Sequence, residues 1–106
     1  MIDFLKNSNK LFERRVRLGV MSVLMVNEWL DFNTLKEMLD LTDGNLASHT
    51  AALEKNQLIE VQKQFVGRKP KTTYRATAYG KQAFQQHLNA LEQLINGDGF
   101  SSKQNE

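Results

Sequence analysis

The stretch LTDGNLASHTAALEKNQLIEVQKQFVGRKPKTTYR, residues 41–75, decides the fold of this chain. Its first part predicts a short helix over residues 42–55, because the Thr42 hydroxyl can accept a hydrogen bond from the first turn. Leu46 and Leu53 are seven residues apart, which places them on one face of that helix. The opposite face carries polar and small side chains, namely Asn45, Ser48, Ala52 and Lys55.

The second part of the stretch predicts a β-hairpin. Residues 58–66 and 72–77 have the alternation of half-buried antiparallel strands, and residues 67–71, GRKPK, predict a tight basic loop between them. The inward positions are Ile59, Val61, Phe65, Tyr74 and Ala76. A polar-faced helix beside a basic hairpin suits nucleic acid, because one rigid element enters a groove while cations hold the phosphates.

Length and composition limit the class of protein. A chain of 106 residues makes one domain with a modest core. The absence of cysteine excludes disulfides and Cys-ligated zinc or iron–sulfur sites. The longest apolar run, residues 23–26, is too short for a signal peptide or a membrane span, so we expect a cytoplasmic protein without membrane contact.

The charges are distributed unevenly along the chain. The formal net charge is only +2, yet no acidic residue lies between Glu60 and Glu92. That interval contains the cations Lys63, Arg68, Lys69, Lys71, Arg75 and Lys81, and a second basic cluster comprises Lys10, Arg14, Arg15 and Arg17. Concentrated positive charge of this kind is typical of a protein that binds a polyanion.

Three further helices are expected around this stretch. Residues 10–28 carry two apolar rows, so we expect this helix to contact both its own core and a partner chain. Residues 34–40, capped by Asn33 or Asp31 and with Leu35, Met38 and Leu39 inward, precede the 42–55 helix and make with it a helix-turn-helix. Residues 78–95 follow a Thr77 cap with an apolar stripe that begins at Tyr79. We expect residues 1–96 to form the domain and residues 97–106 a flexible tail.

This order of elements, together with LTDGNLASH at 41–49, LEKNQLI at 53–59 and TYRATAYG at 73–80, resembles the winged helix-turn-helix transcriptional regulators. The chain is most similar to a small single-domain branch related to the MarR and ArsR families, over about residues 10–95. The resemblance implies a mainly α-helical α+β fold with a small antiparallel hairpin and with N- and C-terminal dimerisation helices. It also implies a homodimer on double-stranded DNA, with the recognition helix (about 42–55) in the major groove and a basic wing (about 66–73) on the flanking backbone or minor groove.

Each part of that implied interface has candidate residues. The recognition helix offers Thr42, Asp43, Asn45, Ser48 and His49. The wing and its surroundings offer Lys63, Arg68, Lys69, Lys71 and Arg75. The surplus apolar positions of the first and last helices predict a dimer interface of Phe4, Leu5, Phe12, Leu88, Leu91 and Ile95. In relatives Gly often stands at the place of Gln57, so either Gln57 adopts the turn conformation with some strain or the turn differs slightly.

Several alternatives remain open in the sequence. His49 either contacts DNA or packs within the fold. A winged-helix protein-interaction module, in which the basic wing meets an acidic protein, is the alternative to a DNA-binding regulator. The sequence shows no Ser/His/Asp set, no glycine-rich phosphate loop and no paired carboxylates at helical spacing beside a nucleophile, so we expect neither an enzyme nor a cofactor. His87 has no second ligand at metal-binding spacing, Met21, Met25 and Met38 are expected to fill the core, and a small-molecule effector is possible although no residues mark its site.

Overall fold

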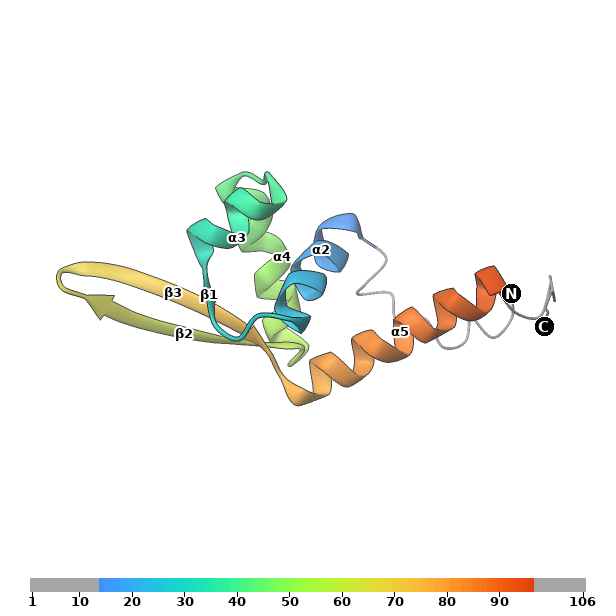
Figure 1. Ribbon diagram of the computed structural model, residues 1–106. Helices are drawn as coiled ribbons and strands as arrows, with labels where there is room; N and C mark the ends of the chain where they lie inside the picture. The colour runs from blue at the N-terminus through green and yellow to red at the C-terminus, as the bar shows by residue number, and fades with distance from the viewer. Residues whose placement is uncertain (1–13, 97–106) are drawn as a thin grey trace.

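The computed structural model describes residues 14–96, which form a helical body with a small sheet. The elements follow one another as α2 (Arg15–Met25), β1 (Leu30–Asp31), α3 (Phe32–Leu39), α4 (Asp43–Lys55), β2 (Ile59–Val66), β3 (Lys69–Ala76) and α5 (Ala78–Asn96). The hairpin of β2 and β3 projects from one end of the body, and α5 extends from the other end (Figure 1). This arrangement confirms the predicted winged helix architecture.

The sheet has three antiparallel strands in the order β1-β3-β2. The sequence did not predict β1, because its two residues are too few to show an alternating pattern. The first helix, expected to end at residue 28, ends at Met25. Strand β3 is central because Tyr74 pairs with Leu30 on one side and with Val61 on the other.

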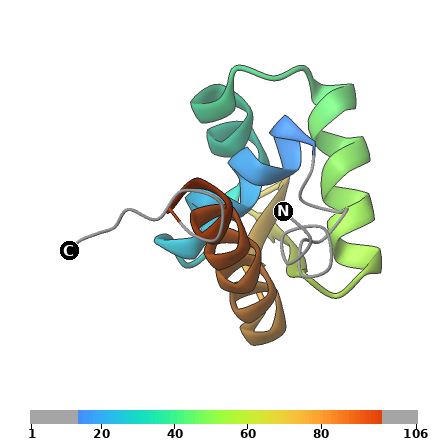
Figure 2. The same cartoon turned by 90° about the vertical axis from the view of Figure 1, so that its right-hand side faces the viewer.

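Helix α2 lies at the centre of the body and contacts α3, α4, β3 and α5 (Figure 2). Its residues Val20, Met21 and Leu24 are fully buried. The second apolar row of this helix, which includes Val16 and Val23, also packs against the chain's own core. Within residues 15–25, therefore, both apolar rows are used by this chain itself.

Tyr74 joins the root of the wing to the helices. The side chain is buried, and its ring centroid lies 6.4 Å from that of Phe32 at the start of α3. Burial raises the pKa of Tyr74, against the smaller opposing effect of a hydrogen bond with the side chain of Thr50 on α4. Thr50 is buried, and its hydroxyl donates to the carbonyl of Leu46 at 2.9 Å, a local hydrogen bond that is common for a threonine within a helix.

The outer half of the hairpin differs from the prediction. Only Gly67 and Arg68 form the turn, since Val66 pairs directly with Lys69, so the expected five-residue loop was wrong. Gly67 has a φ of 66°, a left-handed conformation that glycine adopts without steric cost. The prediction that β2 is half-buried holds only for its first residues, because every residue of β2 from Gln62 to Val66 is exposed.

Three side chains that were expected to face inward are exposed, and Phe65 on β2 is the most exposed of them at 74%. Met38 on α3 is 55% exposed and Tyr79 on α5 is 58% exposed. Helix α3 is only eight residues long, and it buries Leu35 fully and Leu39 partly. On α5 the buried side begins instead with Gly80 and Phe84. The spacing of apolar residues along α3 and α5 therefore did not show by itself which of their side chains are buried.

A close junction connects the end of α4, the start of β2 and the start of α5. Gln57 has a φ of 62°, so of the two alternatives at this position it adopts the strained turn conformation. The Thr77 hydroxyl donates to the Gln57 carbonyl at 2.7 Å and accepts from the Gly80 amide at 2.8 Å, so Thr77 caps α5 as predicted. The Leu58 carbonyl accepts from the Thr77 amide at 3.1 Å.

Gly80 is required at this junction because a Cβ atom there would lie 1.9 Å from the Leu58 carbonyl oxygen. We expect Gly80→Ala to lower the free energy of unfolding by about 2–3 kcal/mol, since the backbone on both sides must shift. Gly44→Ala is the matched control, because nothing lies within 4 Å of its added Cβ. In that helix position alanine should leave stability unchanged or raise it by up to about 1 kcal/mol. Urea unfolding measures both, and equal stabilities for the two variants would contradict this account.

Candidate nucleic-acid interface

Helix α4 presents a polar and small-residue face to solvent. Thr42 caps the helix by accepting from the Asn45 amide at 3.2 Å, as predicted. Asn45 and Ser48 are exposed on the side away from the buried Leu46 and Leu53. Gly44, Ala47 and Ala51 are exposed as well, so no long side chain from these positions would keep the helix away from a partner surface. The backbone of α4 can therefore approach base edges closely, with Asn45 and Ser48 as hydrogen-bonding groups.

Asp43 at the start of α4 is not an isolated negative charge. Its carboxylate lies 2.8 Å from the ammonium of Lys36 on α3. This ion pair connects the two helices of the helix-turn-helix and partly offsets the repulsion between Asp43 and a nearby phosphate. The predicted contact of Asp43 with a base stays a prediction.

His49 lies on the side of α4 that faces α2. The Nε of Arg17 donates to its Nδ1 at 3.1 Å, so the neutral imidazole carries its proton on Nε2. The side chain is half-buried. His49 thus packs partly within the fold, as one of the two open alternatives held, and its contact with DNA stays a prediction.

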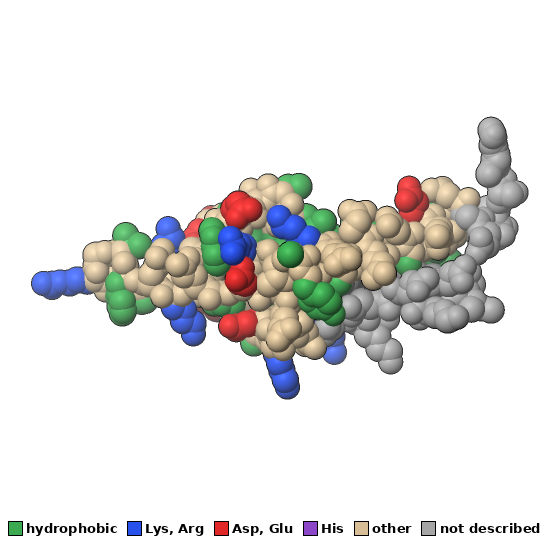
Figure 3. Space-filling model, turned by 90° about the horizontal axis from the view of Figure 1, so that it is seen from below, with side chains coloured by type: hydrophobic (Ala, Val, Ile, Leu, Met, Phe, Trp, Pro, Cys, Tyr) green, Lys and Arg blue, Asp and Glu red, His purple; other side chains and the backbone are tan. Residues whose placement is uncertain are grey.

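The outer part of the wing carries cations that are not neutralised within residues 14–96. Lys63, Arg68, Lys69 and Lys71 are exposed, and none of them forms an ion pair in that part of the chain. Figure 3 shows Lys and Arg side chains along the wing and at its far end, with hydrophobic side chains beside them near the tip. Such free cations are suited to phosphate contacts.

Arg75 has a different environment at the root of the wing. Its guanidinium lies 2.5 Å from Glu60 and 3.6 Å from Glu28, and it stacks over the Trp29 ring at 4.7 Å from the centroid. These contacts connect β2, β3 and the segment before β1. Sequence reasoning placed Arg75 with the wing cations because it did not reveal that Glu28 lies nearby. The DNA contact predicted for Arg75 stays a prediction, on a residue whose charge is already paired.

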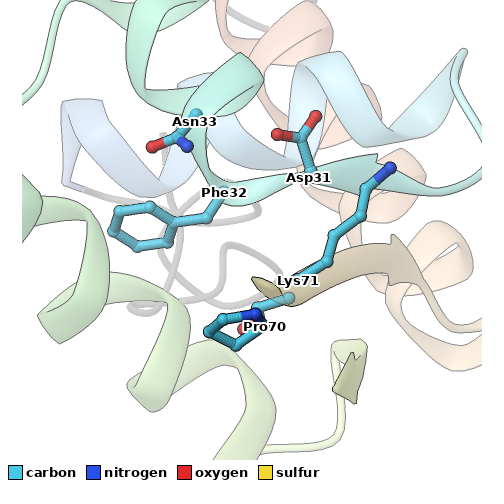
Figure 4. A pocket seen from close by; sticks show the side chains of 6 residues that line it. Asp31, Phe32, Asn33, Pro70 and Lys71 are labelled. Carbon is cyan, nitrogen blue, oxygen red and sulfur yellow. The ribbon is translucent and has the colours of Figure 1, made fainter. Parts of the chain in front are cut away.

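A shallow cavity of about 260 Å³ lies between the wing and the start of α3 (Figure 4). In this view Asp31 and Lys71 lie on one side of it, and Phe32 and Asn33 lie on the other. The Thr34 hydroxyl donates to the Asp31 carboxylate, which lowers the pKa of Asp31, and the charge of Lys71 lowers it further. Lys71 therefore lies near the negative charge of Asp31 and the start of α3.

The predicted dimer residues fall into two groups. Phe4, Leu5 and Phe12 lie outside the described residues. On α5, Leu88 and Leu91 are half-buried, with Leu88 packed against the core, whereas Ile95 is 68% exposed. His87 on the same helix is buried.

Two kinds of feature are absent from residues 14–96. That part of the chain contains no group of three or more His, Cys, Asp or Glu residues placed to hold a metal ion. Over the same residues, the model has no helix of the length and apolar character needed to cross a membrane.

The fold agrees with the comparisons to known proteins. The chain belongs to the winged helix DNA-binding domain family, which matches residues 16–95. It is 36% identical over 85 residues to the uncharacterized protein MJ0432 of Methanocaldococcus jannaschii, covering 80% of this chain and 92% of that protein. It is also similar to a transcriptional regulator homologue from Pyrococcus horikoshii, with a TM-score of 0.82 and 30% identity over 90% of this chain and 95% of that one.

The fold also matches the structure of reduced AbfR bound to DNA. The TM-score is 0.73 at 16% identity, over 92% of this chain and 69% of that chain. At this identity the likeness concerns the fold alone.

The environment of His49 predicts a pH dependence of stability. Burial holds the pKa of His49 below its ordinary value of 6.5, and the positive charges of Arg17 and Arg14 lower it further. The unfolded chain therefore binds a proton on His49 more tightly than the folded chain does. The contribution of neutral His49 to stability is fully present above about pH 6.5, and it is lost as the pH falls through the pKa of His49 in the folded protein. Between pH 8 and pH 5, the free energy of unfolding in urea should fall more for the wild type than for His49→Asn, which keeps a hydrogen-bond acceptor but does not titrate. Equal losses in the two proteins would show that His49 is not perturbed.

Proposed function

We propose that this protein is a homodimeric transcriptional regulator that binds duplex DNA. Helix α4 would enter the major groove, and the wing would lie on the flanking backbone or in the minor groove. The observation that carries the proposal is the combination, on one rigid body, of an exposed polar helix face and a wing with four unpaired cations in the described chain. The DNA-bound structure of AbfR, which shares the fold, supports it.

The two surfaces have separate tasks in this proposal. Lys63, Arg68, Lys69 and Lys71 neutralise phosphates and release counterions, which supplies affinity for any duplex. Asn45 and Ser48 reach base edges and supply the preference for one sequence over another. Asn offers a donor and an acceptor that match adenine, so even this modest set of side chains can discriminate between bases.

The dimer is proposed from the far end of α5. Ile95 is 68% exposed, and Leu91 and Leu94 are half-buried on the same helix, which extends away from the body. A two-fold axis near this end would bury that row against its symmetry mate. The two α4 helices would then enter major grooves separated by about 34 Å, one turn of DNA.

The first test of DNA binding uses a variant with three substitutions in the wing. About six phosphate contacts give a log–log slope of affinity against salt near −5, and Arg68→Ala, Lys69→Ala and Lys71→Ala together should reduce its magnitude by about 3. The triple variant should lose affinity to a similar extent for all duplexes, whereas Asn45→Ala and Ser48→Ala should change which duplex is preferred. Binding is measured by fluorescence anisotropy on duplexes selected from genomic fragments.

Lys81→Ala is the matched control for this test, because Lys81 also lies in the acid-free stretch but sits on α5, in a cavity that it shares with Glu28 and Glu60. Its salt slope should equal that of the wild type. A wild-type protein that binds no duplex even at low salt would overturn the DNA-binding proposal in favour of a protein-interaction module.

A second test concerns the dimer. Ile95→Glu with Leu91→Glu should weaken self-association by about two orders of magnitude or more, because two charges would be buried in an apolar contact. Tyr79→Glu is the control, since Tyr79 is 58% exposed at the opposite end of α5. Sedimentation equilibrium measures the mass of each variant. A monomeric wild type at micromolar concentration would contradict the proposed symmetry.

A further inference from the structure

The tip of the wing carries an apolar patch that the proposed phosphate contacts do not use. Phe65 is 74% exposed and Val66 is 57% exposed at the end of β2. Pro70, directly across the hairpin from Phe65 in the strand register, is exposed too. Directly opposed residues of an antiparallel pair project from the same face with Cβ atoms about 5 Å apart, so Phe65 and Pro70 form one apolar surface.

Cations lie on both faces of the hairpin beside this patch: Lys63 projects from the same face as Phe65, and Lys69 and Lys71 project from the opposite face. Arg68 lies in the turn, Lys69 pairs with Val66, and Lys63 and Lys71 follow along the two strands. No acidic residue occurs between Glu60 and Glu92. In the space-filling view from below, the outer wing shows hydrophobic side chains between Lys and Arg side chains, whereas acidic side chains lie further back (Figure 3). The occupant of this surface must therefore combine anionic groups on its outside with an apolar slot between them.

The minor groove of a duplex has this combination. Its two walls are lines of phosphates, and the faces of adjacent base pairs become an apolar slot when one step is unstacked. Proline and phenylalanine are among the side chains that act as wedges between base steps in proteins that bend DNA through the minor groove.

We propose that the wing tip is a wedge: Phe65, backed by Pro70, inserts at a base step of the minor groove while the surrounding cations hold the phosphates on both walls. The proposal rests on the proposed DNA-binding function and adds to it that the protein bends or locally unstacks its site. Val66, on the opposite face of the hairpin, contacts the groove wall.

The dimensions of the hairpin favour this mode of contact. Two strands about 4.8 Å apart, with their side chains, are wider than the minor groove of undistorted B-DNA at about 6 Å. A tip of this width enters only where the groove opens, and a wedge that kinks the duplex toward the major groove opens it. The flanking sequence should therefore favour TA or CA/TG steps, which unstack at the lowest cost.

The test uses the full chain and a duplex that carries 2-aminopurine at the step next to the recognition site, with a donor–acceptor pair at the duplex ends. Wild-type binding should raise 2-aminopurine fluorescence and shorten the end-to-end distance. Phe65→Ala should remove both signals and weaken binding about tenfold without changing the salt slope. Phe65→Leu should retain most of both signals, because leucine is also a wedge residue.

Val26→Ala is the matched control, because Val26 is 82% exposed but lies outside the wing. It should leave affinity and both signals unchanged. Wild-type binding without unstacking or bending, or signals that persist in Phe65→Ala, would overturn the wedge and leave the DNA-binding function standing. A wild type that binds no duplex at low salt would instead remove the DNA-binding function, and the wedge with it.

Discussion

The contact between Gly80 and the Leu58 carbonyl is the constraint on which the arrangement of this protein depends. At this point the end of α4, the start of β2 and the start of α5 meet within a few ångströms, and a Cβ atom would lie 1.9 Å from the carbonyl oxygen. Thr77 completes the junction with its hydroxyl, which bonds to the Gln57 carbonyl and the Gly80 amide. The direction of α5 is thereby set relative to the recognition helix. A dimer built on α5 thus inherits a defined spacing between two copies of α4.

Tyr74 sets the position of the wing relative to the body, as the contact at Gly80 sets the direction of α5. Its buried ring lies against Phe32, and its backbone pairs with both β1 and β2. The inner part of the wing is therefore anchored to the core, whereas the outer part extends without cover. The proposed insertion of the tip into a groove would leave its position relative to α4 unchanged, because the root of the wing is anchored to the core.

The charges fall into two functional groups that are adjacent in sequence. Arg75 is paired with Glu28 and Glu60 and stacks on Trp29, so it stabilises the root of the wing. Lys63, Arg68, Lys69 and Lys71 have no such partners within residues 14–96 and remain available to an anion. The difference between these groups is that, among these five cations, only Arg75 lies within ion-pair distance of an acidic residue in residues 14–96.

The amino-acid sequence by itself determined the local elements: the Thr42 and Thr77 caps, the apolar face of α4, the turn at Gln57 and the acid-free basic hairpin. These features follow from hydrogen bonding and periodicity over a few residues, so they are visible without a fold. Only the tertiary structure decided that Leu30 and Asp31 add a third strand, that Met38 and Phe65 face solvent, and that Arg17 meets His49. These outcomes depend on which elements lie side by side, and residues as far apart as 17 and 49 are brought together by packing rather than by any local pattern.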